Sequence, residues 1–377
     1  MKHLHIIQTL DLGRSGGLVG VVSLHRAMLR RGMQSYLAYN GAESDVGHPP
    51  SSVKLTALFG NRFLFGWNSA ATLEEIISSV DVVHVHGLYT YMNYVAGRVC
   101  RRDRRLLVYH PHGTLAPAYL RRGRLKKSFV LTAFEQSNFH FASWRALSQV
   151  EAEQIRSQIP NAKIIIVPNG VDLPQSTERV FGGLINLPVR AVAGRRIFLF
   201  LSRVAFVKGL DLLLEAWTQV RAKLEDCELW IAGPNFDGTA SALREKIKKD
   251  GLQNVTVMGM VDNLEKDWLL RAAHVFVLPS RGEGQSAAIL EAMAYEKPIL
   301  LTDRCYFPEA VAANAAFECE VTTSGIASQL VKFAELAAKH LEIMGHHARG
   351  LIVEKFEIGR VAESLDKETE TLLKTVR

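Results

Sequence analysis

The sequence has 377 residues, of which 48% are hydrophobic and 22% charged, with 28 glycines, 12 prolines and four cysteines. This length accommodates two domains with full-sized cores, and the composition excludes disordered, collagen-like and disulfide-scaffold proteins. The net charge of +7 belongs to the first half, because residues 1–180 contain 21 lysines and arginines against 12 acidic residues, whereas residues 181–377 contain 24 against 26.

The cysteines and the apolar segments indicate a cytoplasmic protein. The cysteines are scattered and form no C-x-x-C pair, which argues against a zinc or redox site and suits a reducing compartment. The apolar stretch at the amino terminus ends at Asp11, too early for a signal-peptide core, and no window of 18 uncharged apolar residues exists. We therefore expect no membrane span.

Strand-like apolar runs alternate with helical patterns in the first half. The first run, at 3–10, leads through a glycine-rich turn into a helical pattern from Leu18 to Leu29. Further strand-like runs follow at 35–40, 81–87, 106–113, 139–144 and 164–170. Near-continuous apolar strands between helices predict a parallel sheet covered on both faces.

The alternation stops and then restarts. Residues 170–196 contain two prolines and several glycines without a sustained period, which predicts a linker. Strands are expected at 197–204, 227–233, 255–259, 275–280 and 299–302, with helices near 209–223, 239–250, 262–272 and 286–296 between them. Two helical segments, at 324–345 and 359–376, follow.

These patterns predict an α/β protein of two doubly wound, Rossmann-like domains. We place the first domain at 1–175, the linker at 176–195 and the second domain at 196–355. A C-terminal helix at 356–377 is a candidate to cross back to the first domain. In open α/β sheets, ligands bind at the carboxyl ends of the strands, so we expect the chemistry in the loops there and in a cleft between the domains.

The first such loop ends at Gly16 and Gly17, which open the first helix. Bare backbone amides at a helix amino terminus attract phosphate and other anions. The spacing is not G-x-G-x-x-G, and the next strand ends in Tyr39-Asn40-Gly41 without an acid for a ribose, so a nicotinamide cofactor is not expected. The alternative is a tight turn that only lets the helix pack.

Four histidines end two successive strands as two H-x-H pairs, namely His84, His86, His110 and His112. Their spacing places each pair on one face of the sheet. No carboxylate stands at ligand spacing, so we expect no metal there. His112 comes last and is expected to line the cleft, whereas His84 and His110 are expected to be internal, hydrogen-bonded histidines.

Two strand ends in the second half carry charged groups. Ser202-Arg203 ends one strand and Lys208 begins the helix behind it, which predicts an anion clamp, with a solvated surface pair as the alternative. Farther along, a glycine-bearing loop carries Glu283, and Ser286 is a candidate N-cap of a helix that contains Glu291. Helical side chains lean toward the amino terminus, so Glu291 points toward the amides that would hold a phosphate. A carboxylate is a poor neighbour for a phosphate, so Glu291 would receive a hydroxyl such as that of a ribose. Glu283 would face what lies beyond the phosphates.

These motifs, with others in the same order, resemble the family 4 retaining glycosyltransferases of GT-B fold. The motifs are Gly16-Gly17, 167-VPNGVD-172, Ser202-Arg203-(x4)-Lys208-Gly209, 231-IAGP-234 and the E-x7-E of 283-EGQSAAILE-291. The resemblance covers nearly the whole chain. It implies a UDP- or GDP-linked sugar donor bound mostly by the second domain, an acceptor bound mostly by the first, and metal-independent transfer with retained anomeric configuration.

The resemblance also implies roles for residues. Arg203 and Lys208 would hold the diphosphate, Glu291 the ribose and Glu283 the donor sugar. We expect His112 to bind the donor sugar as well, so Arg203, Lys208, Glu283 and His112 are the catalytic candidates. The remaining donor-binding candidates are Gly16, Gly17, Ser202, Gly233, Gly284, Gln285, Ser286 and Ala287. The family usually has E-G-F-G where this chain has Glu283-Gly284-Gln285-Ser286, which puts the usual sugar preference in question. Glu309, in a Pro-Glu pair common in the family, is a further candidate near the donor.

A basic cluster between residues 101 and 127 contains a single acid, Asp103. The nine cations are Arg101, Arg102, Arg104, Arg105, Arg121, Arg122, Arg124, Lys126 and Lys127. No aromatic platform accompanies them, so nucleic acid is not expected. Each basic side chain near an anionic membrane contributes ~1 kcal/mol, so the cluster predicts peripheral binding to the inner face of the cytoplasmic membrane, with an ordinary solvated face as the alternative.

The sequence therefore predicts a hexosyltransferase of cell-surface polysaccharide synthesis that acts on a glycan or polyprenyl-linked acceptor. Two alternatives share the donor clamp: a GT-B nucleotide-sugar epimerase, which forms an epimer without acceptor, and a non-catalytic sugar-nucleotide-binding protein.

Overall fold

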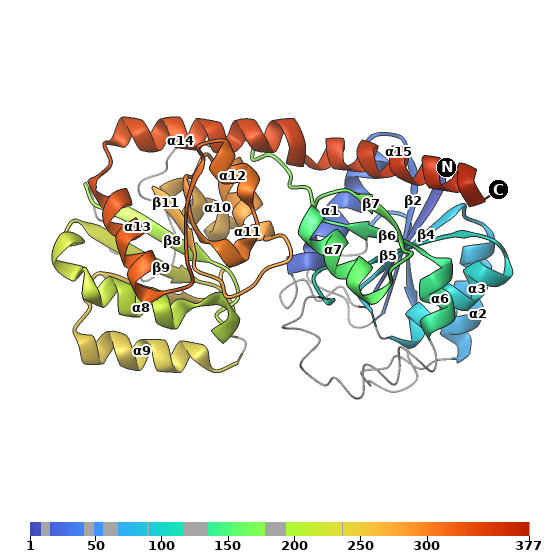
Figure 1. Ribbon diagram of the computed structural model, residues 1–377, viewed down its shortest axis with the longest axis horizontal. Helices are drawn as coiled ribbons and strands as arrows, with labels where there is room; N and C mark the ends of the chain where they lie inside the picture. Colours follow the sequence, from blue (N-terminus) through green and yellow to red (C-terminus); the bar gives the residue numbers. More distant parts are fainter. Residues whose placement is uncertain are drawn as a thin grey trace. The chain divides into compact units, whose positions relative to one another are not determined.

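The computed structural model describes residues 1–8, 16–40, 49–55, 67–88, 90–115, 135–177, 194–235 and 237–376. The chain divides into two compact units, one formed by Met1–Gly170 with Glu357–Arg377 and the other by Val171–Phe356 (Figure 1). The first unit thus ends at Gly170 rather than at 175, and most of the expected linker lies outside the described residues.

The first unit contains a seven-stranded parallel sheet in the order β3-β2-β1-β4-β5-β6-β7. Its strands are β1 (Lys2–Ile7), β2 (Gln34–Asn40), β3 (Ser52–Leu55), β4 (Val82–His86), β5 (Leu106–His110), β6 (Ser143–Ala146) and β7 (Lys163–Ile166). The residues of β4 and β5 are buried along their whole length, as expected for strands covered on both faces.

Helices cover both faces of this sheet. They are α1 (Gly16–Arg30), α2 (Trp67–Ser78), α3 (Tyr91–Arg102), α6 (Gln136–Phe141), α7 (Gln149–Gln158) and α15 (Ile358–Val376). Apolar side chains of α2 and α3 pack with those of β1, β4 and β5 on one face. On the opposite face α1 packs against α15, so the last helix of the chain belongs to the first unit.

The interpretation of residues 139–144 as one strand is wrong. Helix α6 includes Phe139, and the strand begins at Ser143. Phe139 lies edge-on to Tyr109 and to Trp144, with ring centroids 5.0 Å apart in both pairs. A short apolar run packs equally well as a buried helical turn, so periodicity alone does not separate the two.

The second unit contains a six-stranded parallel sheet in the order β10-β9-β8-β11-β12-β13. Its strands are β8 (Arg196–Leu201), β9 (Cys227–Ala232), β10 (Val255–Gly259), β11 (Val275–Leu278), β12 (Ile299–Thr302) and β13 (Ala316–Cys319). Its α-helices are α8 (Leu210–Gln219), α9 (Thr239–Asp250), α10 (Asn263–Ala272), α11 (Ala287–Ala294), α12 (Pro308–Ala312), α13 (Thr323–Glu335) and α14 (Ala338–Leu351). Short turns of helix are η3 (Phe206–Lys208), η4 (Arg221–Lys223), η5 (Asp303–Cys305) and η6 (Ile352–Phe356).

The helix expected at 324–345 is two helices, because a side chain from β8 ends the first one. The Arg196 guanidinium donates to the carbonyl oxygens of Phe333 and Ala334, and to that of Leu336 at 2.6 Å. Leu336 has extended backbone angles and α14 starts two residues later. No glycine or proline marks this break, so the local sequence does not reveal it.

Candidate active site

Two glycines bring the strand ends of the second unit together. At Gly233, after β9, φ is +137°, and a Cβ atom would lie 1.9 Å from the carbonyl oxygen of Ser202, after β8. At Gly209, which follows η3, φ is +71°, and a Cβ atom would lie 2.0 Å from the carbonyl oxygen of Pro279, after β11. Both positions therefore require glycine, and the three loops lie against one another at the carboxyl edge of the sheet.

Lys208 and Glu283 form a buried ion pair at this edge. Lys208 Nζ lies 2.6 Å from Glu283 Oε1, and the two side chains are 8% and 10% exposed. The Ser280 hydroxyl donates to the same carboxylate oxygen at 2.5 Å, and the Glu283 amide donates to the carbonyl of Arg304 at 3.0 Å. Desolvating two charges is costly unless each partners the other, so the pair is held in one arrangement.

Arg281 joins the turn that carries Lys208 to the loop that carries Glu283. Its guanidinium makes two 2.7 Å contacts with the Asp211 carboxylate and donates to the carbonyl of Phe206 at 2.8 Å. The same group lies over the Phe206 ring, 4.1 Å from the centroid. Sequence reasoning missed Arg281, which no motif distinguishes from a solvated arginine.

The amino terminus of α11 lies beyond Glu283. Ser286 is the N-cap residue, and its buried side chain makes no capping hydrogen bond, which leaves the first amides of the helix for another acceptor. Glu291 is half-buried and pairs with Lys266 at 3.1 Å. Of the other candidates on this loop and helix, Gly284, Gln285 and Ala287 are half-buried and Glu309 on α12 is exposed; Ser202 and Arg203 are half-buried at the end of β8.

In the first unit, α1 begins at Gly16, and Gly17 follows within the helix, whereas residues 9–15 of the preceding loop lie outside the described ranges. His112 stands in the loop after β5 with φ +50°, a left-handed conformation in which histidine is enriched. The amide of Gly113 donates to Glu151 Oε1 at 2.6 Å, and the amide of Leu147 donates to Glu151 Oε2 at 2.7 Å. Glu151, which sequence reasoning missed, thus fixes the turn that carries His112.

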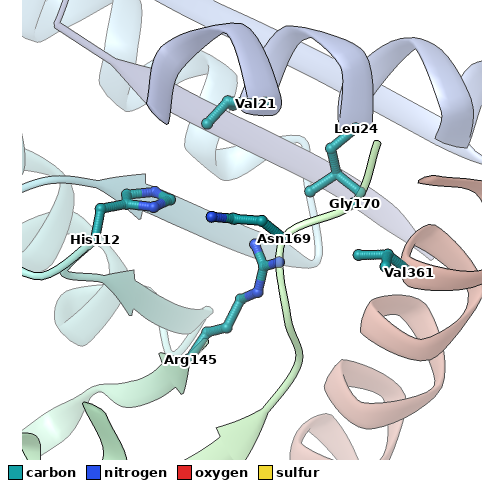
Figure 2. A pocket seen from close by; sticks show the side chains of 8 residues that line it. Val21, Leu24, His112, Arg145, Asn169, Gly170 and Val361 are labelled. Carbon is teal, nitrogen blue, oxygen red and sulfur yellow. The ribbon is translucent and has the colours of Figure 1, made fainter. Parts of the chain in front are cut away.

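His112 lines a small pocket within the first unit, together with Arg145 and Asn169 (Figure 2). Arg145 is buried and donates to the carbonyl oxygens of Val167 and Pro168 and to His110. Burial lowers the pKa of Arg145 to about 10, so its guanidinium is charged at neutral pH. Burial, with the nearby charge of Arg145, lowers the pKa of His112 to about 3, so its imidazole is neutral.

Five histidines lie on the sheet face that α1 and α15 cover, and together with His112 in the loop after β5 they are joined in two hydrogen-bonded rows. The first row, which we call the Arg145 row, contains Arg145, His110, His84, His3 and Asp366, with distances of 3.2, 2.9, 3.0 and 2.8 Å between successive polar atoms. The second, the His112 row, contains His5, His86 and His112, at 3.0 and 2.9 Å. The expectation that His84 and His110 are internal, hydrogen-bonded histidines is confirmed.

Three of the histidines lie close enough together to be considered as metal ligands. Ligand nitrogens of His86, His110 and His112 all lie within 4.8 Å of one another. Both nitrogens of His110 are hydrogen-bonded, one of them to the Arg145 guanidinium, and the His86 and His112 nitrogens that face each other share a 2.9 Å bond. A cation in contact with a candidate ligand opposes a second cation there, so these residues fit a hydrogen-bond network better than a metal site.

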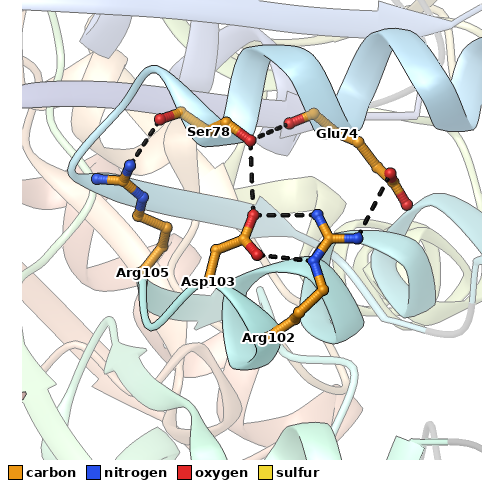
Figure 3. A network of polar contacts seen from close by, with 5 residues as sticks. All are labelled: Glu74, Ser78, Arg102, Asp103 and Arg105. Atoms are coloured by element: carbon orange, nitrogen blue, oxygen red, sulfur yellow. Dashed lines mark hydrogen bonds and ion pairs between the residues drawn. The ribbon is translucent and has the colours of Figure 1, made fainter.

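The described part of the basic cluster is partly neutralised. Arg102 contacts the Asp103 carboxylate at 2.7 and 3.1 Å, and Arg105 donates to the Ser78 carbonyl at 2.6 Å (Figure 3). Arg101 and Arg104 are exposed. The other five cations (Arg121, Arg122, Arg124, Lys126 and Lys127) lie outside the described residues. In the described ranges, no helix combines the length and the apolar character that crossing a membrane requires.

Comparison with known proteins identifies both halves of the chain. A family model for Glycosyltransferase Family 4 matches residues 14–175, and one for Glycosyl transferases group 1 matches residues 195–345. The chain is 27% identical over 228 residues to the GDP-mannose:cellobiosyl-diphosphopolyprenol alpha-mannosyltransferase of Xanthomonas campestris, which aligns over 60% of this chain and 57% of that protein. It is 28% identical to the lipopolysaccharide core biosynthesis mannosyltransferase LpcC of Rhizobium leguminosarum bv. viciae, over 66% of this chain and 73% of that protein. The chain thus aligns with less than three fifths of the length of the Xanthomonas relative.

Solved structures match over nearly the whole chain. HepE of Anabaena, in complex with UDP and glucose, superposes with a TM-score of 0.75 at 17% identity and covers 98% of this chain and 99% of its own. WaaG, a glycosyltransferase involved in lipopolysaccharide biosynthesis, superposes with a TM-score of 0.70 at 14% identity, over 96% and 98% of the two chains. These likenesses confirm the predicted GT-B fold class, and the family models show that this chain belongs to the family 4 glycosyltransferases.

Proposed function

We propose that the protein transfers a sugar from a UDP- or GDP-linked donor to a lipid-linked saccharide or glycan acceptor, without a metal and with retention of anomeric configuration. The observation that carries this proposal is the buried Lys208–Glu283 pair, placed by Gly209 at the strand ends beside the uncapped amino terminus of α11. A fixed cation next to open backbone amides suits a diphosphate. The names of the mannosyltransferase relatives, one of which acts on a diphosphopolyprenol, support the acceptor class.

Bond breaking in this proposal places negative charge on the leaving diphosphate. Lys208, Arg203 and the first amides of α11 receive that charge, and they stabilise the transition state because they are already oriented for it. The bond from the anomeric carbon to the diphosphate oxygen breaks while the acceptor oxygen bonds to the same face. The leaving phosphate takes the acceptor's proton, so no metal ion enters the step.

A donor panel tests the binding half of the proposal. A ligand at 100 times its dissociation constant adds ~2.7 kcal/mol to the free energy of unfolding, which in a domain of this size is a rise in Tm of several degrees. We expect a UDP- or a GDP-sugar to produce such a rise in a thermal-shift measurement and Arg203→Ala to reduce it. The panel should include ADP-sugars as the comparison. If none of the nucleotide sugars raised Tm, the proposed donor class would be contradicted.

We further propose that the basic cluster docks the protein on anionic membrane. Exposed charges are screened beyond ~10 Å at 0.1 M salt, so co-sedimentation with anionic vesicles should fall steeply as salt is added. The double substitution Arg101→Ala with Arg104→Ala removes two exposed cations and should reduce binding. Arg102→Ala is the matched control, because the Arg102 guanidinium already pairs with Asp103, and it should reduce binding less. Equal binding to neutral and anionic vesicles would show that the basic cluster does not dock the protein on anionic membrane.

A further inference from the structure

The direction of every hydrogen bond in the Arg145 row follows from its two ends. A guanidinium only donates, so His110 Nδ1 must accept from Arg145 and its Nε2 must carry the proton. His110 Nε2 then donates to His84 Nδ1, and His84 Nε2 donates to His3 Nδ1. His3 Nε2 donates to the Asp366 carboxylate, which only accepts. All three histidines of this row are therefore neutral imidazoles protonated at Nε2.

The His112 row has no such anchor, and a buried atom at its far end decides its direction. His5 Nε2 is buried and has no hydrogen-bond partner in the described part of the chain. Buried N–H groups without an acceptor are rarer than buried acceptors without a donor, so His5 Nε2 is the unprotonated nitrogen. His5 Nδ1 then donates to His86 Nε2, and His86 Nδ1 donates to His112 Nε2. This direction leaves the proton of His112 on Nδ1.

We propose that His5 and His86 are positioning residues that act through His112: the row holds the ring in one orientation with Nδ1–H offered as a donor to an oxygen of the bound sugar. This inference rests on the proposed function for the identity of the ligand. Nδ1 is the ring nitrogen not engaged in the row, and no described residue accepts a hydrogen bond from it. Glu151 fixes the backbone of the same turn through the Gly113 amide.

The two rows lie side by side and therefore provide an internal comparison. His5 stacks on His84 with ring centroids 4.5 Å apart, and His86 lies 4.3 Å from His110. Burial and the Arg145 charge keep the pKa of these four rings well below the usual value. Neighbouring, equally buried imidazoles on one sheet face thus carry their protons on opposite nitrogens.

Nitrogen-15 NMR of the imidazole rings tests this assignment without any turnover. We expect the Nδ1–H tautomer for His5, His86 and His112, and the Nε2–H tautomer for His3, His84 and His110, at neutral pH. Single substitutions of each histidine assign the signals. An Nε2–H tautomer at His112 would overturn the proposal, whether or not the protein is a glycosyltransferase.

Substitution of His86 tests the consequence for the reaction. His86→Leu removes the donor to His112 Nε2 and should lower kcat/KM for the nucleotide sugar about tenfold, the effect of one lost hydrogen bond on orientation. His86→Asn keeps a donor near the position of Nδ1 and should recover part of the loss. The affinity for the nucleoside diphosphate without sugar should not change, because the proposed hydrogen bond from His112 goes to the sugar.

Two controls separate positioning from a general loss of stability. His84→Leu is the matched variant, since His84 is as buried as His86 and on the same strand but makes no bond to His112. It should lower Tm without the loss in kcat/KM. In a His112→Ala background, His86→Leu should have no further effect. Equal losses from His84→Leu and His86→Leu, or an undiminished loss in the His112→Ala background, would overturn the positioning role. A wild-type protein without transfer activity but with the expected tautomers would refute the proposed function instead.

Discussion

We expect Lys208→Ala and Arg203→Ala each to lower kcat by roughly 10²–10³-fold, the size of effect seen when one donor to a developing oxyanion is removed. Both side chains stand at the carboxyl edge of the second sheet, Lys208 held there by Glu283 and by the turn that Gly209 closes. Steady-state kinetics with a saturating donor measure the loss. Near-wild-type rates in both variants would show that Lys208 and Arg203 do not form a diphosphate clamp.

Stability distinguishes the two variants. Lys208→Ala leaves the Glu283 carboxylate buried without its cation, and breaking a buried pair in this way costs about 3–5 kcal/mol of unfolding free energy. Arg203 is half-buried, so its removal should cost less. Combining Lys208→Ala with Glu283→Gln should recover part of the stability, because no buried charge remains, but none of the activity. Recovery of activity in the double variant would mean that Lys208 serves the fold alone.

The second large effect is a contrast between the two glutamates. Glu291 is proposed to bind the ribose, a part of the donor that does not change in the reaction, so Glu291→Gln should chiefly raise the donor KM. Glu283 is proposed to face the sugar, where positive charge develops, so Glu283→Gln should chiefly lower kcat. Donor-saturation kinetics on both variants with a working acceptor separate the two parameters.

The environments of the glutamates provide a control for this contrast. Glu291 forms a half-buried pair with Lys266, and such pairs contribute about 0–1 kcal/mol, so Glu291→Gln should leave Tm nearly unchanged. Glu283→Gln leaves the buried Lys208 ammonium without an anionic partner and should lower Tm. Full kcat in Glu283→Gln, or exchanged kinetic patterns, would show that the sugar-side and ribose-side roles are assigned wrongly, even though the family is right.

Most of the order of strands and helices could be predicted, because parallel sheets covered on both faces leave a strong pattern in the sequence, but the short edge strands β3 and β13 were missed. Near-continuous apolar runs such as those of β4 and β5 are typical of strands buried on both faces. The break between α13 and α14 could not be predicted, because a side chain from distant β8 produces it. The helical turn at Phe139 was missed for a similar reason, since Tyr109 and Trp144 complete its packing.

The candidate site, too, could be predicted only in part. Charged residues at strand ends were found from the sequence because the topology assigns those ends to ligands. The direct contact between Lys208 and Glu283, the link through Arg281 and the clamp by Glu151 depend on which loops meet, and the spacing of residues does not determine that. The two histidine rows had a visible signal that was overlooked, since 3-HLH-5 repeats the H-x-H of 84–86 and 110–112 on neighbouring strands.

We propose above that this family 4 member transfers the donor's sugar with retention and without a metal. The most direct measurement is NMR analysis of the products formed from a GDP- or UDP-sugar and a diphosphopolyprenyl saccharide, with a chelator present. The account predicts release of the nucleoside diphosphate, growth of the acceptor by one sugar, and the same anomeric configuration in donor and product. An inverted product, a complete block by the chelator, or an epimerised nucleotide sugar formed without acceptor would contradict it.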